Sequence, residues 1–187
     1  WGNMARRAGV KEPIRDKKKI QEIKDWLLVN KTYRDYLLFY LGINTGLRIG
    51  DLVGLKVSQV RNRDEIRIIQ DKTEREVVIP ISQIVQNEIN KYCKDKADSD
   101  YLFASRKGGH ITTRMADFMF RDMANALDIE SWGTHSMRKT YGYFYYKKTN
   151  DVYYLMKLFG HTTQSQTLAY IGIEMDEIKD SLKDFAL

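Results

Sequence analysis

Residues 33–44 constrain the fold more than any other stretch of this sequence. In a helix, the apolar and aromatic side chains of this stretch would cover most of the circumference. They are Tyr33, Tyr36, Leu37, Leu38, Tyr40 and Leu41. A helix that is hydrophobic on nearly every side is stable in water only when other elements cover it. We therefore expect this helix to be central and buried, with the rest of the domain packed around it.

The rest of the chain predicts further helices, because only two prolines, Pro13 and Pro80, interrupt its 187 residues. Side chains that can cap a helix N-terminus precede several apolar stretches. They are Asp16, Thr32, Ser82, Thr112 or Thr113, and Asp151. The expected helices span about residues 17–29, 33–44, 83–93, 114–127, 136–147 and 152–159, with a short helix ending at Leu55 and another that carries Tyr170.

Two short apolar stretches predict a pair of strands. The first lies at residues 66–69 and the second at 77–81, and the polar residues 70–76 form a turn between them. No other clear β pattern is present. The expected fold class is therefore α+β and mainly α-helical, with one small antiparallel sheet and a C-terminal tail helix at 174–187.

Two further apolar patterns concern packing. In the stretch 114–127, the residues at helical spacing predict a core face, and they are Met115, Phe118, Met119, Met123, Ala126 and Leu127. In the tail, Met175, Ile178 and Leu182 also share one face. The tail could pack on its own domain or dock onto a neighbouring protomer, and the sequence leaves both open.

Composition narrows the classes of function. The single cysteine, Cys93, excludes an internal disulfide framework and a cysteine-rich zinc site, and the three histidines lack metal-binding spacing. There is no signal peptide, and no apolar run approaches the ~20 residues of a membrane span. The net charge of +6, with a pI near 9.2, fits a soluble domain that meets a polyanion, most often nucleic acid.

Residues 1–15 are polar and basic and show no periodicity. We interpret them as a linker or a cloning remnant, followed by one domain at 16–187. Arg6 and Arg7 in this segment are candidates for contacts with a phosphate backbone. A solvated tail explains them equally well.

One arginine, Arg48, lies among apolar residues in the segment 44–52. A buried guanidinium costs free energy unless it is paired, and Asp51, one helical turn later, is its expected partner. The pair could be a structural salt bridge. Alternatively, Asp51 could fix the Arg48 fork so that it faces a phosphate. The stretch by itself leaves both readings open.

A second group of polar residues follows in the last third of the chain. His135 and Arg138 share a helix face, and the helix start beside them adds N–H groups that suit an anion. An unrelated polar face would have the same spacing, and His161 could be a half-buried structural histidine. Taken singly, Lys72 in a charged turn and Tyr170, one of twelve tyrosines, carry little information.

The joint order of these residues resembles the catalytic set of the tyrosine recombinases, or phage integrase family. The segment T-G-L-R-I-G-D-L around Arg48 resembles the first arginine motif of that family. H-S-M-R-K-T, which contains His135 and Arg138, resembles its H-x-x-R box. L-F-G-H, which contains His161, resembles its L-G-H box with a phenylalanine inserted before the glycine. Tyr170, nine residues later, falls where the family keeps its nucleophile.

The resemblance implies a site-specific DNA recombinase, the integrase of a phage or other mobile element. It covers residue 16 to the end, which corresponds to the catalytic domain, and the amino-terminal core-binding domain of such proteins is expected to be absent. Lys72 falls at the family's β-hairpin lysine. The implied catalytic residues are Arg48, Lys72, His135, Arg138, His161 and Tyr170, supported by Asp51.

The implied chemistry is cleavage through a 3′-phosphotyrosine without metal, ATP or another cofactor. The two arginines and two histidines would stabilise the phosphate, His135 would accept the tyrosine proton, and Lys72 would protonate the leaving 5′-oxygen. The implied partner is double-stranded DNA at a specific site, with Lys139 and Arg114 as candidate contacts.

The implied assembly is a homotetramer on DNA that is monomeric when free, in the bacterial cytoplasm near the nucleoid and away from the membrane. Two alternatives remain. One is DNA relaxation like that of a type IB topoisomerase, and the other is a non-catalytic DNA-binding module with the same fold.

Overall fold

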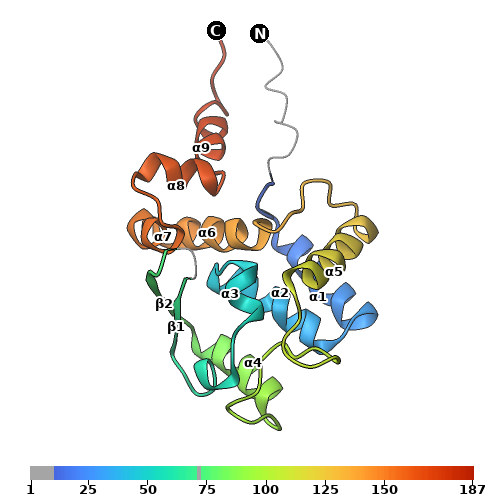
Figure 1. Ribbon diagram of the computed structural model, residues 1–187. Coiled ribbons are helices and arrows are strands. Elements are labelled where there is room, and N and C mark those ends of the chain that lie inside the picture. The colour runs from blue at the N-terminus through green and yellow to red at the C-terminus, as the bar shows by residue number, and fades with distance from the viewer. Residues whose placement is uncertain (1–10, 71–72) are drawn as a thin grey trace.

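The computed structural model describes residues 11–70 and 73–187 (Figure 1). In these ranges the chain is mainly helical, with one two-stranded sheet. Its elements are α1 (Lys17–Asn30), α2 (Tyr33–Thr45), α3 (Ile49–Val53), the 3₁₀ turn η1 (Val57–Gln59), β1 (Glu65–Ile69), β2 (Glu76–Pro80), α4 (Gln83–Cys93), α5 (Thr113–Ala126), α6 (Ser136–Thr149), α7 (Val152–Phe159), α8 (Gln164–Tyr170) and α9 (Ile173–Ser181). The expected fold class is confirmed.

Helix α2 is the centre of the domain, as its apolar circumference predicts. It packs on α1, α3, α4 and α6 (Figure 1). Five successive side chains of the helix are buried, and they are Leu37, Leu38, Phe39, Tyr40 and Leu41. Gly46 ends the helix with a positive φ of 69°, a conformation that glycine adopts without steric cost. The chain then turns into Arg48 and α3.

The expected N-caps are present and explain where five helices begin. The side chains of Asp16, Thr32, Ser82, Thr112 and Asp151 each accept a hydrogen bond from a backbone N–H in the first turn. A cap of this kind contributes about 1 kcal/mol to stability. Of the two threonines that could cap α5, Thr112 is the one that does.

The two strands form an antiparallel hairpin whose inner face joins the core. Ile66 faces Ile79 and Ile68 faces Val77 in the register, and all four side chains are buried. Helix α7 packs against β2. The hairpin is therefore held against the part of the chain that leads to His161.

The core face predicted for α5 is only partly correct. Met119 and Met123 are buried, but Met115 is 45% exposed and Phe118 is 73% exposed. The buried residues are Ala116, Met119, Phe120, Met123 and Ala124. These five residues form a narrower stripe on the helix than the predicted set does. Met115 and Phe118 lie outside this stripe and therefore point away from the core.

Helices α8 and α9 lie on the far side of α6 from the α1–α5 body (Figure 1). In α9 only Ile173 is buried, and the predicted apolar face remains open, with Met175 43%, Ile178 46% and Leu182 51% exposed. Helix α9 does contact its own domain, through Ile173 and the ion pair of Asp176 with Arg15, so the surface that covers its apolar face stays a prediction. None of the helices in the described part of the chain is long and apolar enough to cross a lipid bilayer.

Candidate active site

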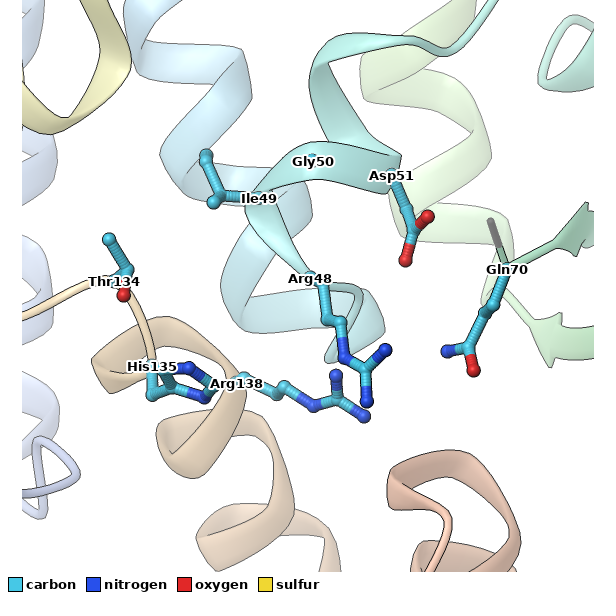
Figure 2. A pocket seen from close by; sticks show the side chains of 8 residues that line it. All are labelled: Arg48, Ile49, Gly50, Asp51, Gln70, Thr134, His135 and Arg138. Atoms are coloured by element: carbon cyan, nitrogen blue, oxygen red, sulfur yellow. The ribbon is translucent and has the colours of Figure 1, made fainter. Parts of the chain in front are cut away.

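A cavity of about 440 Å³ opens where α3, the end of β1 and the start of α6 meet (Figure 2). Three chain segments that are distant in sequence supply its walls. The lining residues are Arg48, Ile49, Gly50, Asp51, Gln70, Thr134, His135 and Arg138. The first arginine motif and the H-x-x-R box therefore share one pocket.

Two of the lining side chains, Arg48 and Arg138, bring their guanidinium groups together (Figure 2). Arg48 stands at the start of α3, and Arg138 lies in the first turn of α6. Arg138 is only 3% exposed, and its Nη2 donates a hydrogen bond of 3.0 Å to the carbonyl of Leu158. Its guanidinium also lies 4.8 Å from the ring centre of Phe159.

Burial and the positive charges of neighbouring arginines both destabilise the charged form of Arg138. Burial of the Arg138 guanidinium is the main reason that its pKa falls to about 10. The charges of Arg48 and Arg75 lower it further, while Tyr170 and Asp51 act in the opposite direction. An anion between the two guanidinium groups would relieve this repulsion.

Tyr170 is hydrogen-bonded to His135. Its hydroxyl lies 2.9 Å from His135 Nδ1, and the two rings meet edge to face. The pKa of His135 is lowered by burial first, and then by the charges of Arg138, Lys139 and Arg48. The lowered pKa favours the neutral imidazole, which accepts the phenol hydrogen bond at Nδ1 when its proton is on Nε2.

Three side chains fix the Tyr170 ring at the end of α8. The ring centre lies 5.0 Å from that of Phe159 and 5.2 Å from that of His161. The ammonium group of Lys139 lies 4.9 Å from it. These contacts hold the ring beside His135, which lines the pocket.

The environment of Tyr170 acts on its acidity in two directions. Burial raises the pKa of the phenol, and the charges of Arg138 and Arg48 lower it by a smaller amount. The net result is a phenol that stays protonated at neutral pH. It therefore needs a base to become a nucleophile.

His161 lies between α7 and α8. Gly160 precedes it with a φ of 73°, and the His161 N–H donates to the carbonyl of Met156. His161 Nδ1 lies 2.9 Å from Thr167 Oγ1. Burial and then the charge of Arg138 lower the pKa of the imidazole. Because Nδ1 is engaged, Nε2 is the ring nitrogen left for a ligand.

Arg75 belongs to this neighbourhood, although the sequence reading did not select it. Its Nη2 donates to Gln70 Oε1 and to the carbonyl of Leu158, both at 3.3 Å. Arg138 uses the same Leu158 carbonyl. Strand alternation could have identified Arg75, because it lies on the side of the buried Val77.

The remaining predicted residues stand as follows. Lys72, Arg6 and Arg7 lie outside the described residues. Arg114 is exposed in the first turn of α5, away from the pocket lining. Lys139 donates a hydrogen bond to a backbone carbonyl and lies over the Tyr170 ring.

Asp51 lines the pocket. Its negative charge acts on Arg138, whose pKa it raises. Across residues 11–70 and 73–187, no three His, Cys, Asp or Glu side chains are grouped as metal ligands.

Arg48, Arg138 and His135 line the pocket, and Tyr170 and His161 lie next to His135, an arrangement that matches the pattern of the tyrosine recombinases. The chain belongs to the phage integrase family, whose model matches residues 15–177. It is 39% identical over 175 residues to the probable integrase/recombinase YoeC of Bacillus subtilis strain 168, a match that covers 93% of this chain and 96% of that protein.

Other relatives are longer. Tyrosine recombinase XerH of Campylobacter jejuni is 24% identical over 194 residues, which cover 96% of this chain but 54% of XerH, so the chain spans about half of that relative. The crystal structure of XerA recombinase has the same fold, with a TM-score of 0.73 at 18% identity, and the match covers 95% of this chain and 67% of XerA.

Proposed function

We propose that this chain is a site-specific DNA recombinase, the integrase of a phage or other mobile element. It cleaves and rejoins DNA strands through a covalent 3′-phosphotyrosine at Tyr170. The observation that carries this proposal is the 2.9 Å hydrogen bond from Tyr170 to His135 beside two guanidinium groups. The 39% identity to a probable integrase/recombinase supports it.

The two arginines hold the scissile phosphate. Negative charge builds on the non-bridging oxygens as the attacking oxygen approaches, and preorganised donors stabilise that charge more than they stabilise the ground state. The guanidinium groups of Arg48 and Arg138 come together in the lining of the pocket, where the phosphate would bind (Figure 2). The fork of each guanidinium matches the geometry of two phosphate oxygens. His161 adds a donor through Nε2.

His135 is the general base. The phenol proton passes to His135 Nδ1 as the Tyr170 oxygen bonds to phosphorus, and the bond from phosphorus to the 5′-oxygen breaks. Lys72 supplies a proton to this leaving oxygen. The products are a 3′-phosphotyrosine and a free 5′-hydroxyl. Attack by the 5′-hydroxyl of another strand reverses these steps and needs no ATP.

The positive net charge of the chain supports DNA as its partner. The net charge of +6 would lie against the phosphate backbone, with Arg6, Arg7 and Arg114 among the contacts. The ammonium group of Lys139 is already hydrogen-bonded in this structure, so a DNA contact by Lys139 requires that bond to break. Affinity for DNA should fall steeply with rising salt.

A covalent adduct tests this proposal directly. A nicked suicide substrate carrying the cognate site traps the cleaved strand on the protein, and we expect an adduct that disappears in Tyr170→Phe. Tyr153→Phe is the matched control, since Tyr153 is 63% exposed and outside the pocket. Absence of any adduct on cognate DNA would favour the binding module. An adduct together with relaxation of any supercoiled plasmid would favour topoisomerase-like activity.

The tail docks onto a neighbouring protomer when a tetramer assembles on DNA. Its open apolar face supports this part of the proposal, because exposed apolar faces commonly mark interaction sites. Replacing Ile178 and Leu182 together by aspartate should impair pairing of two DNA sites more than cleavage of one strand. Lys183→Gln on the same tail is the control. Equal loss of pairing and cleavage would contradict this role.

A further inference from the structure

The segment before α1 is packed on the domain and forms a strap, which we define as residues 11–16. Its backbone is held at two points. The N–H of Glu12 donates to the carbonyl of Ser131 at 3.3 Å, and the N–H of Ile14 donates to Thr140 Oγ1 at 2.9 Å. Ile14 is itself 8% exposed. The strap therefore has a defined path across α6.

Arg15 connects the strap to the segment that follows the Tyr170 helix. Its Nη2 donates to the carbonyl of Gly172 and its Nε to Asp176 Oδ2, both at 3.3 Å. The guanidinium also lies 5.5 Å from the ring centre of Tyr143. Gly172 is two residues beyond Tyr170 and has a φ of 78°. A Cβ atom there would clash with the Arg15 guanidinium, so the close contact depends on glycine.

Lys139 connects the strap to the tyrosine ring itself. Its Nζ donates a hydrogen bond of 2.7 Å to the carbonyl of Lys11 and lies 4.9 Å from the Tyr170 ring centre. One ammonium group thus contacts the strap and the tyrosine at once. The strap reaches the Tyr170 segment at two separate points, through the side chains of Arg15 and Lys139.

We propose that Arg15 and Lys139 are positioning residues, through which the strap holds Tyr170 in line with the phosphate pocket. This inference rests on the proposed function, since it concerns delivery of the nucleophile. Neither residue lines the pocket between Arg48 and Arg138. Displacement of the strap would move the backbone beyond Tyr170 and remove the cation over its ring. Both changes would alter the attack geometry without changing the phosphate donors.

The first test separates positioning from DNA binding. Arg15→Gln removes the guanidinium contacts with the Gly172 carbonyl and Asp176, together with the ion pair to Glu12 within the strap. A misplacement of about 1 Å can cost as much as 10²-fold in rate. We expect the adduct-forming rate at saturating nicked DNA to fall ten- to a hundredfold, with an unchanged half-saturating DNA concentration. Arg15→Lys should recover part of the rate, because lysine restores the charge facing Asp176.

Arg121→Gln is the matched control. Arg121 is an exposed arginine whose ion pair is with Asp117, one turn away on the same helix. We expect it to leave the rate and the DNA affinity unchanged. Wild-type melting temperatures for all variants would show that the domain remains folded. An unchanged rate for Arg15→Gln would overturn the inference.

A second measurement does not depend on catalysis. Hydrogen exchange of the free 187-residue chain should be faster at residues 164–177 in Arg15→Gln and in Lys139→Gln than in the wild type. Unchanged exchange in both variants would overturn the inference that the strap holds the Tyr170 segment. Faster exchange with an unchanged cleavage rate would also overturn it, because the contact would then be structural only.

The two proposals fail in different ways. A wild-type chain that forms no adduct at Tyr170 contradicts the proposed function, and hydrogen exchange alone then decides whether the strap holds the Tyr170 segment. A wild-type chain that forms the adduct, with Arg15→Gln equally fast, leaves the recombinase proposal intact and refutes the positioning role.

Discussion

Replacing Arg138 with methionine should separate the stability of the domain from its activity. The side chain is 3% exposed, so its charge is almost fully removed from water. The fall of its pKa from 12.5 to about 10 corresponds to about 3 kcal/mol of cost for keeping the cation in the folded protein. Methionine fills a similar shape without this cost.

The substitution also removes favourable contacts of similar size. A hydrogen bond from a charged donor is worth about 1.5–3 kcal/mol, and the contact with the Phe159 ring about 1 kcal/mol. The Leu158 carbonyl loses one donor but keeps Arg75, so it is not left unsatisfied. The opposing contributions nearly cancel. We expect the free energy of unfolding of Arg138→Met to lie within about 1 kcal/mol of the wild type.

Urea unfolding measures the stability, and adduct formation on nicked DNA measures the activity. The rate should fall by about 10²–10³, the usual loss for one charge-stabilising donor. Arg121→Met, at an exposed arginine, should leave both quantities nearly unchanged. If Arg138→Met lowers the free energy of unfolding by more than about 3 kcal/mol, the argument that burial of the charge offsets its contacts is refuted. Activity within tenfold of the wild type would refute the role in phosphate binding.

Further predictions concern the base and the turn before His161. Burial and neighbouring cations lower the pKa of His135, so the adduct-forming rate should fall only as the pH drops below about 6.5 and His135 gains a proton. His135→Gln should remove this acidic limb and His161→Gln should keep it; the opposite pattern in pH–rate profiles would exclude His135 as the base. Gly160→Ala should destabilise the chain by about 1–2 kcal/mol in urea, because φ is 73° and the new Cβ would lie 3.2 Å from Arg75. Gly54→Ala, whose nearest contact would be 3.7 Å, is the control, and equal effects would contradict the argument.

The sequence predicts best what local chemistry determines. Asp16 and Thr32 cap their helices through hydrogen bonds to residues two and three positions away. Both partners of such a bond lie in the same short stretch of sequence, so the stretch alone predicts the cap. The apolar circumference of α2 predicts its central place for the same reason. The order of the motifs also predicts that Arg48 and Arg138 lie close together, because the resemblance to a known family implies the tertiary structure of that family.

What the sequence does not reveal depends on contacts across the fold. Arg15 meets a carbonyl 157 residues away, and the Ile14 N–H meets a hydroxyl 126 residues away, so no local pattern marks either one. Helical spacing predicts that Phe118 belongs to the core, yet this side chain is 73% exposed. The period of a helix defines its faces, but only the neighbouring elements determine which face is covered.

The hydrogen bonds to the carbonyl of Leu158 limit which insertions, deletions and substitutions this protein can accept in α7. It accepts hydrogen bonds from Arg138 and Arg75 through a main-chain oxygen, which no side-chain substitution removes. Adding or deleting one residue in α7 would instead rotate that oxygen by about 100° and break both bonds. The chain length between Asp151 and Leu158 should therefore tolerate no change, whereas residue 158 can vary among apolar side chains that fit.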